Sequence, residues 1–117
     1  SDLFISLLLF PFLSLDQREK ILLKIYKSLK VGGALIIVDK CYSEYPAIQD
    51  IFNQIYFDEK IKNKLTKNQV LNKAKSLRGT MNIYQQNEIV NFCRKAGFKK
   101  IDIFFKWFNF VGIILIK

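Results

Sequence analysis

The hydrophobic positions of the chain change period where a helix gives way to a strand. Apolar residues follow helical spacing over residues 15–29, and an unbroken apolar run fills residues 34–38. Between them stand Gly32 and Gly33, which can end a helix and turn the chain at little conformational cost. A continuous apolar run is typical of a strand that is covered on both faces. The stretch therefore predicts a helix, a tight turn and a buried strand of an α/β protein.

The residues before this helix predict an earlier strand. Residues 2–6 are mostly apolar, and the run continues through residues 7–9, where the pattern fits either more strand or a loop packed on the core. Ser14 and Gln17 have the spacing of a capping box, which sets the start of the helix. Strand, helix and strand then form a βαβ crossover, which is right-handed in nearly all proteins.

Residues 45–79 change the pattern, and we interpret them as a helical insertion between strands. Helical spacing begins at Pro46, which suits a first helical turn, and it continues to about Asp58. A second helix is predicted from Thr66, which has the spacing of a capping box with Gln69. The insertion therefore separates the first two strands from the rest of the sheet.

The C-terminal part of the chain predicts one more helix and a hairpin. Helical spacing extends over about 84–96 and ends at Gly97. Alternation over 98–105 and an apolar run over 110–117 then indicate two antiparallel strands. At 117 residues, half of them apolar, the chain suits one domain with a real core.

Polar residues stand at the carboxyl ends of both N-terminal strands. Ser6 ends the first, and Asp39 and Lys40 end the second. Open α/β sheets bind their ligands at this edge. Ser6 fits a small loop residue as well as a binding residue, and the sequence names no partner for proton transfer to Asp39 or Lys40.

The residue types exclude several kinds of chemistry. The chain has no histidine, and its two cysteines, Cys41 and Cys93, are far apart. Imidazole-based zinc sites and Ser-His or Cys-His nucleophiles are therefore excluded, and we predict no metal site. Both cysteines are interpreted as buried small hydrophobes. Catalysis would use carboxylates, Lys, Tyr, Cys or positioning alone.

The N-terminal apolar run does not predict a membrane segment. Residues 3–13 fall short of the roughly 20 apolar residues that a membrane helix needs. Asp2 is the opposite of the basic start of a signal peptide. We therefore expect a cytoplasmic protein with no membrane association. The abrupt start within an apolar run suggests that further chain precedes it.

Positive charge widens the range of partners. A net charge of +9 favours polyanions such as RNA, although codon bias explains a Lys-rich composition equally well. Seven of the 19 basic residues lie between residues 57 and 79. This stretch fits either a solvated surface or an anion site. Within it, Arg78 has the forked geometry that suits a carboxylate.

Two motifs resemble those of class I S-adenosylmethionine-dependent methyltransferases. Leu29-Lys30-Val31-Gly32-Gly33 resembles their L-x-P-G-G turn before the fifth strand, with Val31 in place of proline. Lys95-Ala96-Gly97-Phe98 resembles the K-A-G-F before their sixth strand. The resemblance implies an α/β, partial Rossmann-like methyltransferase fold. Residues 1–117 would be its C-terminal half, with strands 4 to 7, flanking helices and the insertion.

A more specific resemblance is to the carboxy-S-adenosylmethionine synthase family. It is carried by Lys24-Ile25-Tyr26, Gly32-Gly33-Ala34-Leu35, Lys40 and the ending Phe108-Asn109-Phe110. It implies a transferase that converts S-adenosylmethionine and prephenate into carboxy-S-adenosylmethionine. That product serves the modification of wobble uridine in bacterial tRNA.

The same resemblance suggests binding residues but no catalytic one. Where the family has a cofactor-binding asparagine, this chain has Ser6 if one residue is inserted before Phe12, and Leu7 if not. The family arginine that holds the added carboxylate aligns with Ala74, so the nearby Arg78 is the substrate-carboxylate candidate. The glycine-rich cofactor loop is absent from these residues. We therefore expect the chain to be inactive by itself.

A second hypothesis is a non-catalytic module derived from the same fold. The charge of +9 and the missing loop favour RNA binding, with contact to tRNA through the basic residues. Half a sheet also leaves an open strand edge and exposed apolar faces. Under either hypothesis, these features favour a homodimer.

Overall fold

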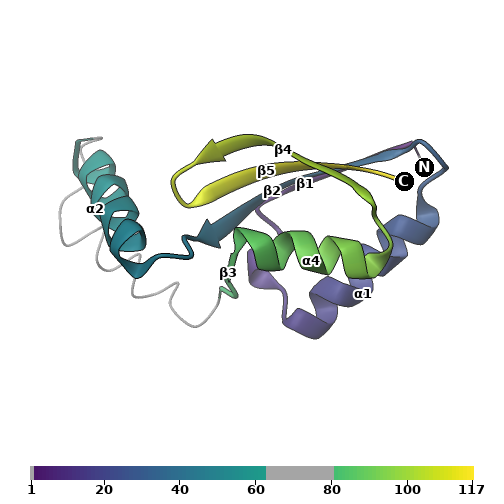
Figure 1. Cartoon of the computed structure of the whole chain (residues 1–117), viewed down its shortest axis with the longest axis horizontal. Coiled ribbons are helices and arrows are strands. Elements are labelled where there is room, and N and C mark those ends of the chain that lie inside the picture. The colour runs from purple at the N-terminus through teal and green to yellow at the C-terminus, as the bar shows by residue number, and fades with distance from the viewer. Residues whose placement is uncertain (1, 63–80) are drawn as a thin grey trace.

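The computed structural model describes residues 2–62 and 81–117, which form a mixed sheet with two helices against one face (Figure 1). The second helix predicted for the insertion, from Thr66, lies outside these residues. The elements, in chain order, are β1 (Leu3–Leu7), the 3-10 turn η1 (Phe10–Phe12), α1 (Leu15–Ser28), β2 (Ala34–Tyr42), α2 (Pro46–Lys62), β3 (Tyr84–Gln85), α4 (Gln86–Ala96), β4 (Lys100–Trp107) and β5 (Phe110–Ile116).

Helix α1 begins and ends where the sequence predicts. The Ser14 hydroxyl accepts a hydrogen bond from the Gln17 amide at 3.2 Å, and the Gln17 side chain accepts one from the Ser14 amide at 2.9 Å. This pair is the predicted capping box. After the helix, Gly32 takes a φ of +85°, and a Cβ on Gly33 would lie 2.9 Å from the Lys30 carbonyl oxygen. Both glycines are therefore required by the turn into β2.

The sheet has the order β1-β2-β5-β4, and the short β3 pairs with the end of β2. β1 and β3 run parallel to β2, and β5 runs antiparallel to both of its neighbours. The crossover through α1 and the C-terminal hairpin are confirmed. The helix predicted over about 84–96 begins two residues later, at Gln86, because Tyr84 and Gln85 pair with the end of β2.

Helices α1 and α4 lie together on one face of the sheet, which we call the covered face (Figure 1). Alternate residues of the two central strands point toward these helices and exclude water. They form the middle of the core: Leu35 and Ile37 from β2, and Val111, Ile113 and Leu115 from β5.

The opposite face, which we call the open face, carries Leu3, Ile5 and Leu7 of β1 beside Ala34, Ile36 and Val38 of β2. Ile5 is 59% exposed and Leu7 is 67% exposed. The prediction that β2 would be covered on both faces is therefore wrong for the part of the chain that the structure describes. The apolar run is present, but α1 and α4 pack on one side only.

No helix within residues 2–62 and 81–117 is long and apolar enough to cross a membrane.

Candidate functional site at the carboxyl ends of the strands

The two positions predicted to bind a cofactor point to opposite faces of β1. Ser6 pairs with Ile37 and lies on the covered face, where its hydroxyl is buried without a hydrogen-bond partner among the described residues. Leu7 pairs with Val38 on the open face. The next residue, Leu8, has a φ of +57°, unusual for a branched side chain, and its amide donates to the Val38 carbonyl at 2.8 Å. The strand therefore ends in a tight, fixed turn at this edge.

A buried ion pair lies beneath the same edge. Arg18 Nη1 donates to Asp39 Oδ2 at 2.6 Å, and the two side chains are 2% and 0% exposed. Asp39 Oδ1 accepts from the Lys40 amide at 2.8 Å. The sequence pointed to Asp39 but missed Arg18. The available signal was the position of Arg18 one helical turn before the core residue Leu22.

Aromatic rings surround the Arg18 guanidinium. Its central carbon lies 5.2 Å from the ring centroid of Phe10 and 5.1 Å from that of Tyr84. Burial raises the pKa of Asp39, and the positive charge of Arg18 opposes that rise. Because breaking such a pair leaves a buried charge without a partner, Arg18 and Asp39 tie α1 firmly to the end of β2.

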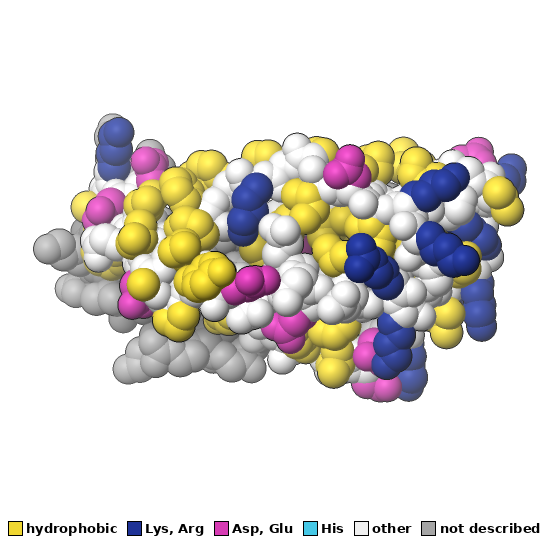
Figure 2. Space-filling view, viewed as in Figure 1, with side chains coloured by type: hydrophobic (Ala, Val, Ile, Leu, Met, Phe, Trp, Pro, Cys, Tyr) yellow, Lys and Arg dark blue, Asp and Glu magenta, His cyan; other side chains and the backbone are white. Residues whose placement is uncertain are grey.

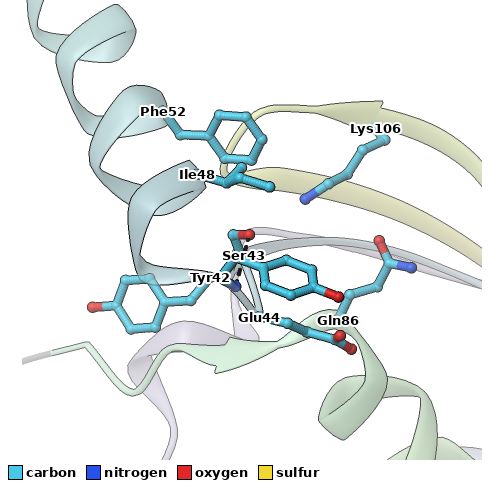
Figure 3. A pocket seen from close by; sticks show the side chains of 8 residues that line it. Tyr42, Ser43, Glu44, Ile48, Phe52, Gln86 and Lys106 are labelled. Atoms are coloured by element: carbon cyan, nitrogen blue, oxygen red, sulfur yellow. Dashed lines mark hydrogen bonds between the residues drawn. The ribbon is translucent and has the colours of Figure 1, made fainter.

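The third prominent feature is a cleft of about 320 Å³ between α2, the end of β2 and the start of α4 (Figure 3). Glu44 and Lys106 are its charged residues, and Phe52 contributes an aromatic wall. Lys106 Nζ lies 2.7 Å from the Phe108 carbonyl oxygen and 3.0 Å from Cys41 Sγ. The cleft therefore combines an apolar wall with one charge of each sign.

The Phe108-Asn109-Phe110 motif places α2 beside the sheet. Asn109 is buried, its carbonyl accepts from the Cys41 amide at 2.7 Å, and its side chain accepts from Gln49 Nε2 at 2.8 Å. The Phe52 ring of α2 packs against Phe108 with centroids 5.4 Å apart. Since α2 has no buried residue of its own, these contacts determine where it lies.

Both cysteines belong to the buried core. Cys41 and Cys93 are free and fully buried, which confirms the interpretation as small hydrophobes. Burial raises the pKa of Cys93 to about 12, so its thiol is neutral at physiological pH. Among residues 2–62 and 81–117, no group of three or more His, Cys, Asp or Glu is placed to hold a metal ion.

The predicted carboxylate-binding position lies outside the described residues. Both Arg78 and Ala74 belong to residues 63–80, as does most of the Lys-rich stretch. Lys60 and Lys62 are the exceptions, in the last turn of α2. Arg78 therefore stays a prediction.

The arrangement of strands and helices matches solved methyltransferases. The chain aligns over 99% of its length with the S-adenosylmethionine-dependent methyltransferase SibL in its apo form, with a TM-score of 0.64 and 14% identity, covering 30% of that protein. Human N-acetylserotonin methyltransferase, solved in complex with S-adenosylmethionine, gives a TM-score of 0.64 at 16% identity over 99% of this chain and 29% of its own. The chain therefore has the α/β fold of these methyltransferases.

Comparison of amino-acid sequences identifies more specific relatives than comparison of folds does. The chain is 42% identical to the carboxy-S-adenosyl-L-methionine synthase of Staphylococcus epidermidis over 96% of its length and 49% of the relative. The synthase of Campylobacter jejuni is 34% identical over 99% of this chain and 49% of the relative. No protein-family model matches the chain. The chain is thus related to the C-terminal part of these synthases, and it spans about half the length of the curated relatives it matches.

Proposed function

We propose that residues 1–117 form the C-terminal half of an S-adenosylmethionine-binding transferase that makes carboxy-S-adenosylmethionine from S-adenosylmethionine and prephenate. The observation that carries this proposal is the 42% identity to a carboxy-S-adenosyl-L-methionine synthase over nearly the whole chain. The methyltransferase fold supports the cofactor class. Residues 45–79 would be the helical insertion of this half-domain.

In this proposal the chain contributes one side of the cofactor site. Bound S-adenosylmethionine supplies an activated sulfonium group. The carboxyl end of β1, with Ser6 or Leu7, would position it, and Arg78 would bind the carboxylate of the substrate. Because the described residues offer no activated nucleophile, the chain would act by orienting the reactants and excluding water.

The proposal also includes the use of the product, the cellular compartment and the oligomeric state. The product would serve wobble-uridine modification of tRNA in the cytoplasm. We also propose a homodimer, supported by the apolar open face and by the edge of β1, whose only described neighbour is β2.

Calorimetry tests the proposal on the complete gene product that carries this chain. Titration with S-adenosylmethionine or with its carboxylated form is expected to release heat, whereas residues 1–117 alone are expected to give none. Leu7→Asp should abolish binding, while Leu3→Asp, at the other end of the same strand face, should preserve it. Absence of heat with both compounds would refute the proposal.

A second candidate function is RNA binding without catalysis. Figure 2 shows Lys and Arg side chains gathered over the end of the molecule that holds both termini and the end of α1. Lys24 and Lys27 are exposed there and have no ion-pair partner within the described chain. Retention of tRNA on a filter should then be strong at low salt and fall steeply as salt is added. No retention at low salt would exclude this function.

A further inference from the structure

Two lysine side chains lie on the same aromatic ring at the carboxyl end of β2. The Nζ of Lys40 is 5.5 Å from the ring centroid of Tyr56, and the Nζ of Lys60 is 5.0 Å from it. Lys40 belongs to β2, whereas Tyr56 and Lys60 belong to α2. All three residues are only partly exposed. Two positive charges from different elements therefore lie at one partly buried aromatic ring, that of Tyr56.

Lys40 follows directly after the buried Asp39. Because successive residues of a strand point to opposite faces, Lys40 shares the open face with Val38 and Leu7. It therefore lies near the carboxyl edge of the sheet, past the end of β1, which pairs up to Val38, and before the end of β2 at Tyr42. This is the edge at which open α/β sheets bind ligands.

Aromatic rings form a wall beside the two lysines. Phe110 is the register partner of Lys40, and its ring centroid lies 6.1 Å from that of Tyr56. Trp107 stacks on Phe110 with centroids 5.9 Å apart. The two ammonium groups thus border a flat apolar surface on the open face, which suits a ligand with both an acid group and an apolar body.

Among the described residues, no ion pair neutralises the charge of Lys40 or Lys60. Neither side chain takes part in an ion pair of the described residues, and the nearest acidic residue along β2, Asp39, faces the other way toward Arg18. Residues 63–80 contain no Asp or Glu, so that stretch has no carboxylate to offer. Each of the two ammonium groups therefore contacts the Tyr56 ring without an ion-pair partner among the described residues.

We propose that Lys40 and Lys60 together bind the carboxylate of a small organic acid whose apolar part lies on Tyr56 and Phe110. The inference rests on the proposed function and deepens it by naming two residues, in addition to Arg78, that bind an acid group of the substrate. An ammonium group is a compact and strongly hydrated charge, so binding through two of them is expected to weaken as salt is added.

The test uses the complete gene product with prephenate as the probe, in the presence of S-adenosylmethionine. Lys40→Gln is expected to weaken the binding of prephenate by about tenfold or more, and Lys60→Gln should weaken it in the same direction. Lys99→Gln, an exposed lysine between α4 and β4, is the matched control and should leave it unchanged. Lys40→Arg should restore part of the affinity. Affinity for S-adenosylmethionine is measured on every variant.

The outcomes separate this inference from the proposed function. Loss of prephenate binding in Lys40→Gln with unchanged S-adenosylmethionine binding supports the inference. Unchanged prephenate binding in Lys40→Gln overturns it and leaves the proposed function standing. A wild-type protein that binds no S-adenosylmethionine refutes the proposed function itself. If Lys40→Gln reduces tRNA retention while prephenate binding stays intact, the lysines contact RNA and the inference is wrong.

Discussion

The two faces of the sheet are built from the same kinds of side chain but have different surroundings. On the covered face, Ile37 is 1% exposed beneath α1 and α4, whereas Ile5 on the open face is 59% exposed. The covered face also buries its charge as a hydrogen-bonded pair, while Lys40 on the open face has no ion-pair partner among the described residues. The buried contacts that stabilise this chain are therefore concentrated on the covered face, whereas Lys40 and its aromatic neighbours lie on the open face.

The largest expected effect comes from breaking the buried ion pair. Asp39→Ala leaves the Arg18 guanidinium buried without a counter-charge, and we expect the free energy of unfolding to fall by about 3–5 kcal/mol. Asp16→Ala breaks the exposed pair with Lys20 and should lower it by at most about 1 kcal/mol. Urea denaturation measures both variants.

An apolar replacement of the whole pair provides a further check on this prediction. Arg18→Met combined with Asp39→Leu removes both charges and should regain most of the stability lost in Asp39→Ala. Equal losses in Asp39→Ala and Asp16→Ala would contradict the view that the covered face carries the stability.

Truncation of matched isoleucines compares the two faces directly. Ile37→Ala removes buried methyl groups and should lower the free energy of unfolding by about 2–5 kcal/mol. Ile5→Ala removes the same groups from an exposed position and should change it by about 0.5 kcal/mol or less. Denaturant unfolding of residues 1–117 gives both values. A similar loss in both variants would mean that the open face is covered in solution.

A smaller effect is expected from pH. Burial raises the pKa of Cys93 from 9.0 to about 12, so the neutral thiol is favoured in the folded state. The resulting stabilisation is complete below pH 9.0 and is lost as the pH rises toward about 12, because the unfolded chain ionises first. Cys93→Ala lacks this thiol and should lose less stability between those limits. An identical alkaline decline in wild type and Cys93→Ala would contradict the prediction.

Local features of the fold could be predicted from the sequence because neighbouring residues determine them. The capping box of Ser14 and Gln17, the Gly32-Gly33 turn and the hairpin all depend on short spacings. The helical spacing predicts that α4 starts at about residue 84, but Tyr84 and Gln85 form β3 instead, because they pair with the distant strand β2. The apolar run of β2 does not reveal what packs on each of its faces. The exposed apolar face agrees instead with the expectation that half a sheet leaves such a face uncovered.

The candidate site depends more heavily on contacts between distant residues. Alternation along β2 is enough to place Asp39 and Lys40 on opposite faces. Their partners come from distant parts of the chain. Arg18 contacts Asp39 because α1 packs on the sheet. Tyr56 contacts Lys40 because α2 is held beside the sheet by Asn109 and Phe108. No local sequence pattern predicts these contacts. Sequence reasoning therefore located the edge of the sheet but not the residues that meet there.

The position of β5 has a consequence for how the protein forms during synthesis. This strand follows every other strand in the chain, yet it lies inside the sheet between β2 and β4. Until residues 110–116 have left the ribosome, β2 and β4 have no strand to join them, and the edge of β2 that pairs with β5 stays unpaired. The sheet is therefore completed only after β5 emerges, through long-range pairings that form slowly. Loss of these seven residues would divide the sheet in two.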